Sequence, residues 1–398
     1  MDPSSFGWME KFFAEQKITK VNLASNELDF YTKTRATGFI FGHIISFDVP
    51  VSISLKNKLP EEISKIGLLN TLFGMYGLIK QDVSPDNFLS EVIDFYNIIA
   101  SKSNNPLEKL LSNNSKSSKL EKIIQERVQT NDDFFSKQFS HVITNAILFI
   151  DILAFKKYLE KGVQIEEYFN KLEQSVMEIV TLALKSKICT PENDELITTL
   201  FESSFRNTKF SKNNTTTVEN IDLGYLKNNL EKYYLIDIAS ISLKSDEKLE
   251  NDAHYFLIKL AQKLDISENF IIESDCFISN YITEYKNEIP YLNTSNSMTT
   301  FYNHTIKNVA VLINRNKKRL VKELSESKEL VQLIAKSTHK ELNKDEKKKV
   351  KNQLLDICKT VPSLSIFLLP GGSLLLPILI KFIPQLLPSA FNENKEDQ

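Results

Sequence analysis

The chain has little glycine and none of the short motifs that mark common enzyme sites. Only 10 of its 398 residues are glycine. No GxGxxG, phosphate-loop or GxSxG pattern occurs, so nothing supports a nucleotide-dependent or hydrolytic enzyme. The five histidines show neither HxxxH nor HExxH spacing. We therefore expect a protein that is not an enzyme and that carries no cofactor.

Cysteine is also scarce. Cys189, Cys276 and Cys358 are far apart and form neither a CxxC pair nor a zinc-binding spacing. This usage is typical of unpaired thiols in a reducing compartment. The first residues, MDPSSFGWMEKFF, lack the basic region and apolar core of a signal peptide. We expect the body of the chain to stay in the cytoplasm, where it is made.

No strong excess of charge is present. The formal net charge is −2, which argues against general nucleic-acid binding, including DNA, through bulk charge. Two runs, at 314–322 and 344–351, are nevertheless basic. A solvated helix face, contact with anionic lipid headgroups and contact with ribosomal RNA all remain open for them. The candidate contact residues are Lys317, Lys318, Arg319, Lys347, Lys348 and Lys349.

Long stretches with helical periodicity predict a mostly α fold of multi-helix bundles. Residues 38–55 are the one strand-like region, and we expect at most a small N-terminal hairpin there. A core helix is expected around 146–155, and a long helix over about 300–337. The predicted division is an N-terminal helix and hairpin (1–58), a helical bundle (59–204), a second helical unit (221–300), basic helices (301–360), a hydrophobic segment (361–391) and an acidic tail (392–398).

Residues 245–252 form an acidic turn. Asp246, Glu247 and Asp252 suit either oxygen ligation of a divalent cation or the capping of the flanking helices. The EF-hand pattern fails because no glycine lies at the loop centre. We favour capping and assign no metal ligand. The stretch 234–264, with its helix, acidic turn and helix, resembles the bundle of TerB-like tellurite-resistance domains, and a similar rhythm at 66–98 suggests a degenerate internal duplication.

The most informative segment is the apolar tail. Residues 361–380 carry no charged side chain, and about 20 apolar residues can cross a bilayer. The prolines predict a kinked or broken segment. The alternative is a buried hydrophobic hairpin within a soluble bundle. If the tail is inserted, the preceding lysines place the N-terminal body on the cytoplasmic face of the inner membrane.

Residues 342–391 resemble the membrane-proximal part of the Letm family, the leucine-zipper, EF-hand-containing transmembrane proteins. The whole layout is similar to the Letm-related biofilm-associated proteins of flavobacteria. The motif positions of this resemblance are Val361, Pro362, Phe367, Pro370, Ser373, Leu376, Pro377, Lys381, Pro384, Leu387, Pro388, Ser389 and Phe391. At position 373 the family usually has an acidic residue, and this chain has a serine.

The resemblance implies a non-enzymatic, membrane-associated scaffold or adaptor whose partners are membrane lipid, a membrane protein or a second copy of the chain. A component of cation or proton transport is the first alternative, which the serine at position 373 weakens because a buried carboxylate is the natural ion carrier in a membrane. A ribosome-binding tether is the second. In the mitochondrial members the ribosome-binding domain is expected beyond Phe391, so this function does not carry over on the matching residues.

Overall fold

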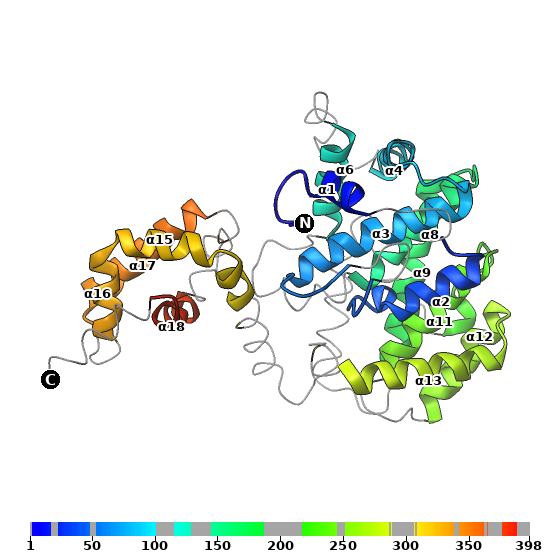
Figure 1. Ribbon diagram of the computed structural model, residues 1–398. Helices are drawn as coiled ribbons and strands as arrows, with labels where there is room; N and C mark the ends of the chain where they lie inside the picture. Colours follow the sequence, from blue (N-terminus) through cyan, green and yellow to red (C-terminus); the bar gives the residue numbers. More distant parts are fainter. Residues whose placement is uncertain are drawn as a thin grey trace. The chain divides into compact units, whose positions relative to one another are not determined.

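The chain folds into two compact helical units in the computed structural model (Figure 1). The N-terminal unit comprises residues 1–56, 60–130 and 139–297, and the C-terminal unit comprises residues 57–59, 131–138 and 298–398. The structure describes residues 2–16, 23–47, 53–100, 115–128, 145–186, 217–244, 251–285, 288, 306, 309–337, 342–361, 364 and 376–387. All regular elements in these ranges are helical, which confirms the predicted fold class.

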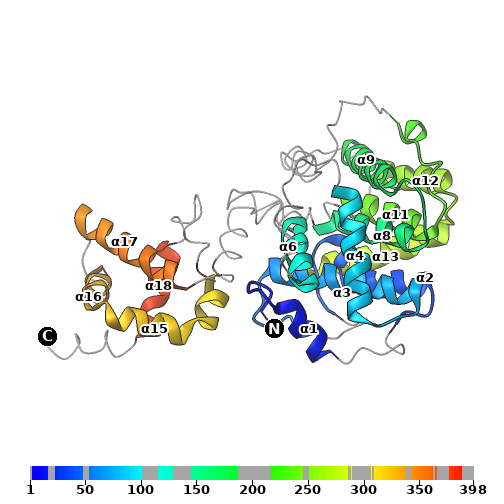
Figure 2. The same cartoon turned by 90° about the horizontal axis from the view of Figure 1, so that it is seen from above.

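In its described residues, the N-terminal unit is built from α-helices and two 3-10 turns (Figure 1, Figure 2). Its described elements are α1 (Trp8–Glu15), α2 (Glu27–Ala36), η2 (Phe39–Phe41), α3 (Pro60–Lys80), α4 (Pro85–Ala100), α6 (Lys116–Val128), α8 (Phe149–Leu159), α9 (Ile165–Lys185), η3 (Val218–Asn220), α11 (Asn229–Leu243), α12 (Asn251–Leu264) and α13 (Glu268–Tyr285).

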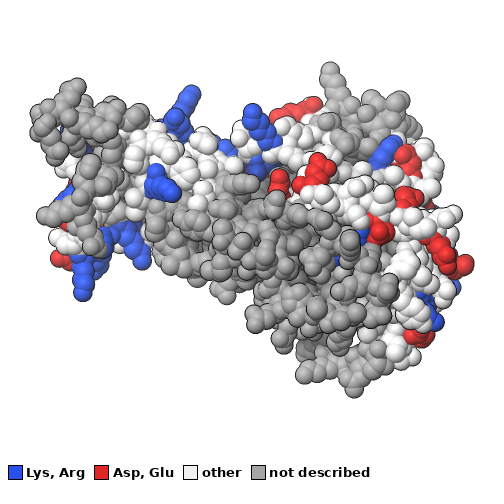
Figure 3. Space-filling model, turned by 90° about the horizontal axis from the view of Figure 1, so that it is seen from below, with Lys and Arg blue, Asp and Glu red and all other residues white. Residues whose placement is uncertain are grey.

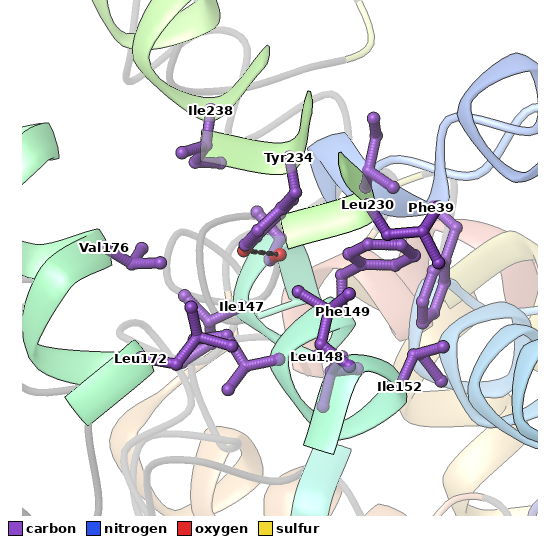
Figure 4. Close-up of a cluster of buried hydrophobic side chains, with 14 of the residues drawn as sticks. Phe39, Ile147, Leu148, Phe149, Ile152, Leu172, Val176, Leu230, Tyr234 and Ile238 are labelled. Carbon is purple, nitrogen blue, oxygen red and sulfur yellow. Dashed lines mark hydrogen bonds between the residues drawn. The ribbon is translucent and has the colours of Figure 1, made fainter. Parts of the chain in front are cut away.

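Helices α3, α8 and α11 form the centre of this unit. Each is apolar around most of its circumference, as expected of a helix that neighbours cover on all sides. Helix α8 confirms the predicted core helix, since Phe149, Ile152 and Phe155 are fully enclosed. Figure 4 shows this core, in which Tyr234 of α11 donates a hydrogen bond of 2.8 Å to the carbonyl of Ala146.

Helix α1 is held by a distant carboxylate. Gly7 precedes α1 with a φ of 83° and offers no side chain to cap the exposed amides. Glu121 of α6 replaces that cap: its two oxygens accept hydrogen bonds from the amides of Gly7 and Met9 at 3.0 and 2.9 Å. A carboxylate at this end also complements the helix dipole. With Trp8 and Phe12 buried, α1 is a packed part of the unit.

The strand-like region did not become a hairpin in its described part, residues 38–47 and 53–55, where no strand is present. Gly38 and Gly42, with φ of 79° and 77°, bracket the single turn η2. A Cβ at Gly38 would lie 2.1 Å from the carbonyl oxygen of His43, so the turn requires glycine there. The apolar side chains that suggested a strand fill the core instead: Phe39, Ile40, Phe41, Ile44 and Phe47 are buried.

The C-terminal unit contains α15 (Lys317–Glu326), α16 (Lys328–Ser337), α17 (Lys344–Thr360) and α18 (Leu376–Leu386). The prediction of one long helix over 300–337 is wrong, because the chain leaves helical geometry at Ser327 (φ −105°, ψ 72°) between α15 and α16. The break lets Leu324 and Leu330, on either side of it, pack into the same core. The finer division into six segments, including the boundary near 205–220, stays a prediction, as does the TerB-like resemblance.

Candidate functional site

The described helices of the C-terminal unit enclose their own small core. Apolar side chains from all four helices meet in one cluster, with α18 lying beside the other three (Figure 1). The members that face one another across the cluster are Leu320 and Leu324 of α15, Leu330 and Ile334 of α16, Val350, Leu354 and Cys358 of α17, and Leu379 and Ile383 of α18. The charged side chains of these helices are consequently directed outward.

Helix α17 begins at a capping box. The Asn343 side chain accepts a hydrogen bond of 2.8 Å from the amide of Glu346, and the Glu346 carboxylate accepts one of 3.0 Å from the amide of Asn343. This start fixes which residues face the core. Lys344, Lys348 and Lys351 lie at i, i+4 and i+7 and are exposed, so they share one side of the helix.

Lys348 and Lys349, two of the predicted contact residues on α17, differ in their surroundings. The Lys349 ammonium donates a hydrogen bond of 2.8 Å to Glu329 of α16, and Gln353 donates one of 3.0 Å to the same carboxylate. The Lys349 contact lowers the pKa of the Glu329 carboxyl. Lys347 and Lys348 are exposed. Lys349 thus ties α17 to α16, while Lys348 belongs to the outward row.

The predicted residues on α15 are also exposed. Lys317, Lys318 and Arg319 are consecutive, so they spread around about 200° of the helix and form no single row. Residues 298–398 contain 17 lysines and arginines against 10 aspartates and glutamates, whereas the rest of the chain has 32 against 41. Figure 3 shows this contrast on one face: acidic side chains gather on the N-terminal unit and mostly basic ones mark the C-terminal unit.

Part of the tail motif lies inside the C-terminal core. Val361 is buried at the end of α17, and its carbonyl accepts a hydrogen bond of 2.8 Å from the amide of Leu364. Leu376 begins α18 and is buried, whereas Lys381 is exposed on the same helix. Pro377, Pro384 and Leu387 lie in or at the end of α18. The motif residues outside the described ranges are Pro362, Phe367, Pro370, Ser373, Pro388, Ser389 and Phe391.

Helix α18 spans 11 residues, or about 16 Å at 1.5 Å per residue. Across the described ranges, none of the helices combines the length and the apolar character that crossing a membrane requires.

Metal and thiol chemistry have no assembled site in the described residues. No group of three or more His, Cys, Asp or Glu side chains there could hold a metal ion. Most of the acidic turn, residues 245–250, lies outside the described ranges. Cys358 is buried in the C-terminal core, and burial raises the pKa of its thiol to about 12. Cys276 is exposed on α13.

Sequence reasoning missed a buried charged centre in the N-terminal unit. Asp237 of α11 is fully buried and pairs with Arg35 of α2, whose Nε lies 3.0 Å from Oδ2. Tyr31 and Ser274 donate hydrogen bonds to the same carboxylate. Burial raises the pKa of Asp237 although the Arg35 charge opposes this. The Arg35 guanidinium also lies 4.6 Å from the ring centre of Phe277.

A second centre has the same composition. Asp151 of α8 is fully buried and accepts hydrogen bonds from Arg127 of α6 and Tyr96 of α4. The Arg127 guanidinium lies 5.4 Å from the ring centre of Phe169. Both aspartates lie in an Ile-Asp-Ile triplet, at 150–152 and 236–238. This repeated triplet is the sequence feature that could have pointed to the two buried charged centres. In each centre the aspartate and the arginine come from different helices, and loss of either partner would leave a buried charge uncompensated, so these groups hold the helices in their positions.

Two compact helical units, one of them with a small core and an outward basic surface, define an all-α protein. Residues 342–398 match the family model described as LETM1-like, RBD. The C-terminal segment of the chain is therefore Letm1-like, as predicted from its motif. No curated protein and no solved structure shows a significant match to the chain.

The match corrects one expectation. We expected the ribosome-binding domain of the family to lie beyond Phe391, but the matching model is itself named for the RBD and begins at residue 342. Helices α17 and α18 are thus part of the matched segment. The exposed Lys344 and Lys351, which the initial set of contact residues omitted, also fall in it. Helical periodicity in the sequence was the signal that would have included them.

Proposed function

We propose that this protein is a non-enzymatic, membrane-associated adaptor that holds ribosomes through its basic C-terminal unit. The observation that carries the proposal is the match of residues 342–398 to the LETM1-like RBD model. The exposed lysines of α17 support it, because phosphate-rich partners are bound largely through lysine and arginine. The N-terminal unit then serves as a helical scaffold.

An adaptor role also fits the buried charges. The carboxylates of Asp237 and Asp151 each accept hydrogen bonds from an arginine and a tyrosine inside the bundle. Groups enclosed in this way hold helices together and have no free face for a substrate. Ion transport has less support, since Ser373 replaces the acidic residue that the family usually has at this position.

The experiment that tests the proposal is co-sedimentation of the full chain with purified ribosomes. Binding at low ionic strength that weakens steeply with added salt is the expected result, because the contact is electrostatic. A chain that stays in the supernatant with saturating ribosomes at low salt contradicts the proposal. An acidic helical protein of similar size is a suitable control for trapping in the pellet.

Membrane association is the second part of the proposal. It is supported by the Letm1-like segment and by the uncharged run 361–380, and the basic helices before the run favour the cytoplasmic face of the inner membrane. The test is alkaline-carbonate extraction of membranes from cells that express the full chain. The comparison variant carries Phe367→Ser, Leu368→Ser and Leu369→Ser, which leaves the described core residues of α15–α18 unchanged.

The full chain is expected to resist extraction and the serine variant to be released. If both are released, the apolar run acts as a packing element and the membrane proposal fails, whatever the ribosome assay gives. If both resist, residues other than 367–369 hold the protein at the membrane.

A further inference from the structure

We propose that the outward row Lys344, Lys348 and Lys351 of α17 binds the phosphate backbone of RNA, without reading its base sequence. The inference rests on the proposed function, since ribosomal RNA would be the natural partner, and it names the surface and the mode of contact. It also divides the basic residues of the unit into those that bind RNA and those that join helices.

The geometry of the row suits a chain of phosphates. At 100° per residue, positions 344, 348 and 351 fall within an arc of about 60°, and they span about 10 Å along the axis. The side of α17 that carries Val350, Leu354 and Ile357 is buried in the core of the unit. The row is therefore held in place by packing, and its three ammonium groups can face successive phosphates of one strand.

The row differs from the neighbouring lysines in its surroundings. Among the described residues, no carboxylate lies within ion-pair distance of Lys344, Lys348 or Lys351. Other lysines of the same unit are paired: Lys349 with Glu329 at 2.8 Å, and Lys336 with Glu346. In a paired lysine the carboxylate competes with an incoming phosphate for the ammonium group, so binding to a polyanion gains less from that lysine. The unpaired row is the more favourable place for phosphate.

RNA fits this surface better than a membrane does. Helices that lie in a lipid interface present large apolar side chains next to their lysines. The apolar side of α17 is occupied by the core of its own unit. Large exposed apolar side chains among the described residues, such as Phe6, Val163 and Ile272, all belong to the N-terminal unit. The described surface of the C-terminal unit thus carries charged side chains but no large exposed apolar side chain that could insert into a membrane.

The test compares two double variants of the full chain that change the net charge equally. The row variant is Lys348→Gln with Lys351→Gln, and the matched control is Lys336→Gln with Lys349→Gln. All four positions are exposed, and the two ion pairs that the control removes are surface pairs, which contribute at most about 1 kcal/mol each, so both variants are expected to remain folded at the assay temperature. Binding of each protein to a single-stranded uridine oligonucleotide is measured by fluorescence anisotropy at several salt concentrations.

The row variant should bind more weakly, and the slope of log affinity against log salt should fall by about 1.4, or 0.7 for each lost phosphate contact. The control should retain nearly the wild-type slope. Equal losses in the two variants would show a diffuse charge effect and overturn the assignment to the row. Wild-type affinity in the row variant would overturn it as well.

Two further arms separate this inference from its alternatives. Vesicles with anionic lipid replace RNA in the first arm; if the row variant loses vesicle binding but binds RNA like the wild type, the row contacts headgroups and the RNA assignment is wrong. Ribosomes replace RNA in the second. If the row binds RNA but the full chain does not pellet with ribosomes, the proposed function fails while the RNA-binding row stands.

Discussion

Arg35 and Asp237, 202 residues apart in the sequence, form an ion pair that is closed off from solvent. The two side chains are 3% and 0% exposed. Because Tyr31 and Ser274 bind the same carboxylate, one side chain joins α2, α11 and α13. The cost of burying these charges is offset only while each charge keeps its partner.

Removal of Asp237 should therefore destabilise the N-terminal unit strongly. Asp237→Ala leaves Arg35 buried without a counter-charge, and the free energy of unfolding should fall by about 3–5 kcal/mol in urea titrations. Glu167→Ala, which removes an exposed pair with Lys171, is the control and should change it by less than about 0.5 kcal/mol. Similar small effects of both substitutions would mean that the pair has no structural importance.

Asp82 should make the corner between α3 and α4 sensitive to acid. Hydrogen bonds from Tyr76, Asn87 and the amide of Ser84 lower its pKa to about 2. Because the folded-state pKa lies below the unfolded value, this stabilisation is complete above about pH 4 and is lost as pH falls toward 2. Carboxyl NMR titration should give an Asp82 midpoint near 2, and Asp82→Asn should remove this part of the acid sensitivity. A midpoint near 4 would contradict the assignment.

Helix α18 should behave as a structural part of the C-terminal core. Leu379 is 1% exposed, and Leu379→Ala should reduce the stability of the unit by about 2–5 kcal/mol through lost burial and a new cavity. Gln385→Ala, at an exposed position of the same helix, should have little effect. Thermal unfolding of the purified full chain measures both. If Leu379→Ala is as stable as the wild type, α18 does not pack against α15–α17 in solution.

The two described cysteines should differ sharply in reactivity. Cys276 is exposed, whereas Cys358 is buried with its pKa raised to about 12 by desolvation, and the thiolate is the reactive form. A maleimide reagent at neutral pH should modify Cys276 within minutes and spare Cys358 until the C-terminal unit unfolds. Peptide mass mapping reads out each site. Equal labelling of the folded protein would show that Cys358 is accessible.

The sequence predicted those features that depend on local patterns. Pro60 and Pro85 begin α3 and α4, and Asn343 caps the start of α17, so each of these helices begins at a local signal that the sequence contains. The tail motif was sufficient to identify the Letm1-like segment. The residues that make up each of these signals are close together in the chain, so a single sequence is sufficient to detect them.

Features that depend on distant contacts were not predictable. The apolar residues after Gly38 have strand propensity, but two left-handed glycines and the surrounding core decide their conformation. In the sequence, Asp237 is a single acidic residue in an apolar helix, and only the fold brings Arg35 beside it. Likewise, the distinction between Lys348 and Lys349 arises from Glu329 on another helix. Propensity cannot report such pairings, because the partner is far away in the sequence.

The Glu121 cap on α1 has a consequence for the order in which the protein folds. Its carboxylate is 114 residues from the amide of Gly7, so the end of α1 gains this cap only after the intervening chain has closed into a loop. Contacts between residues so far apart form later than single helices do. Trp8 and Phe12 therefore enter the core when α1 docks against α6, and α1 depends on the tertiary fold for both its cap and its burial.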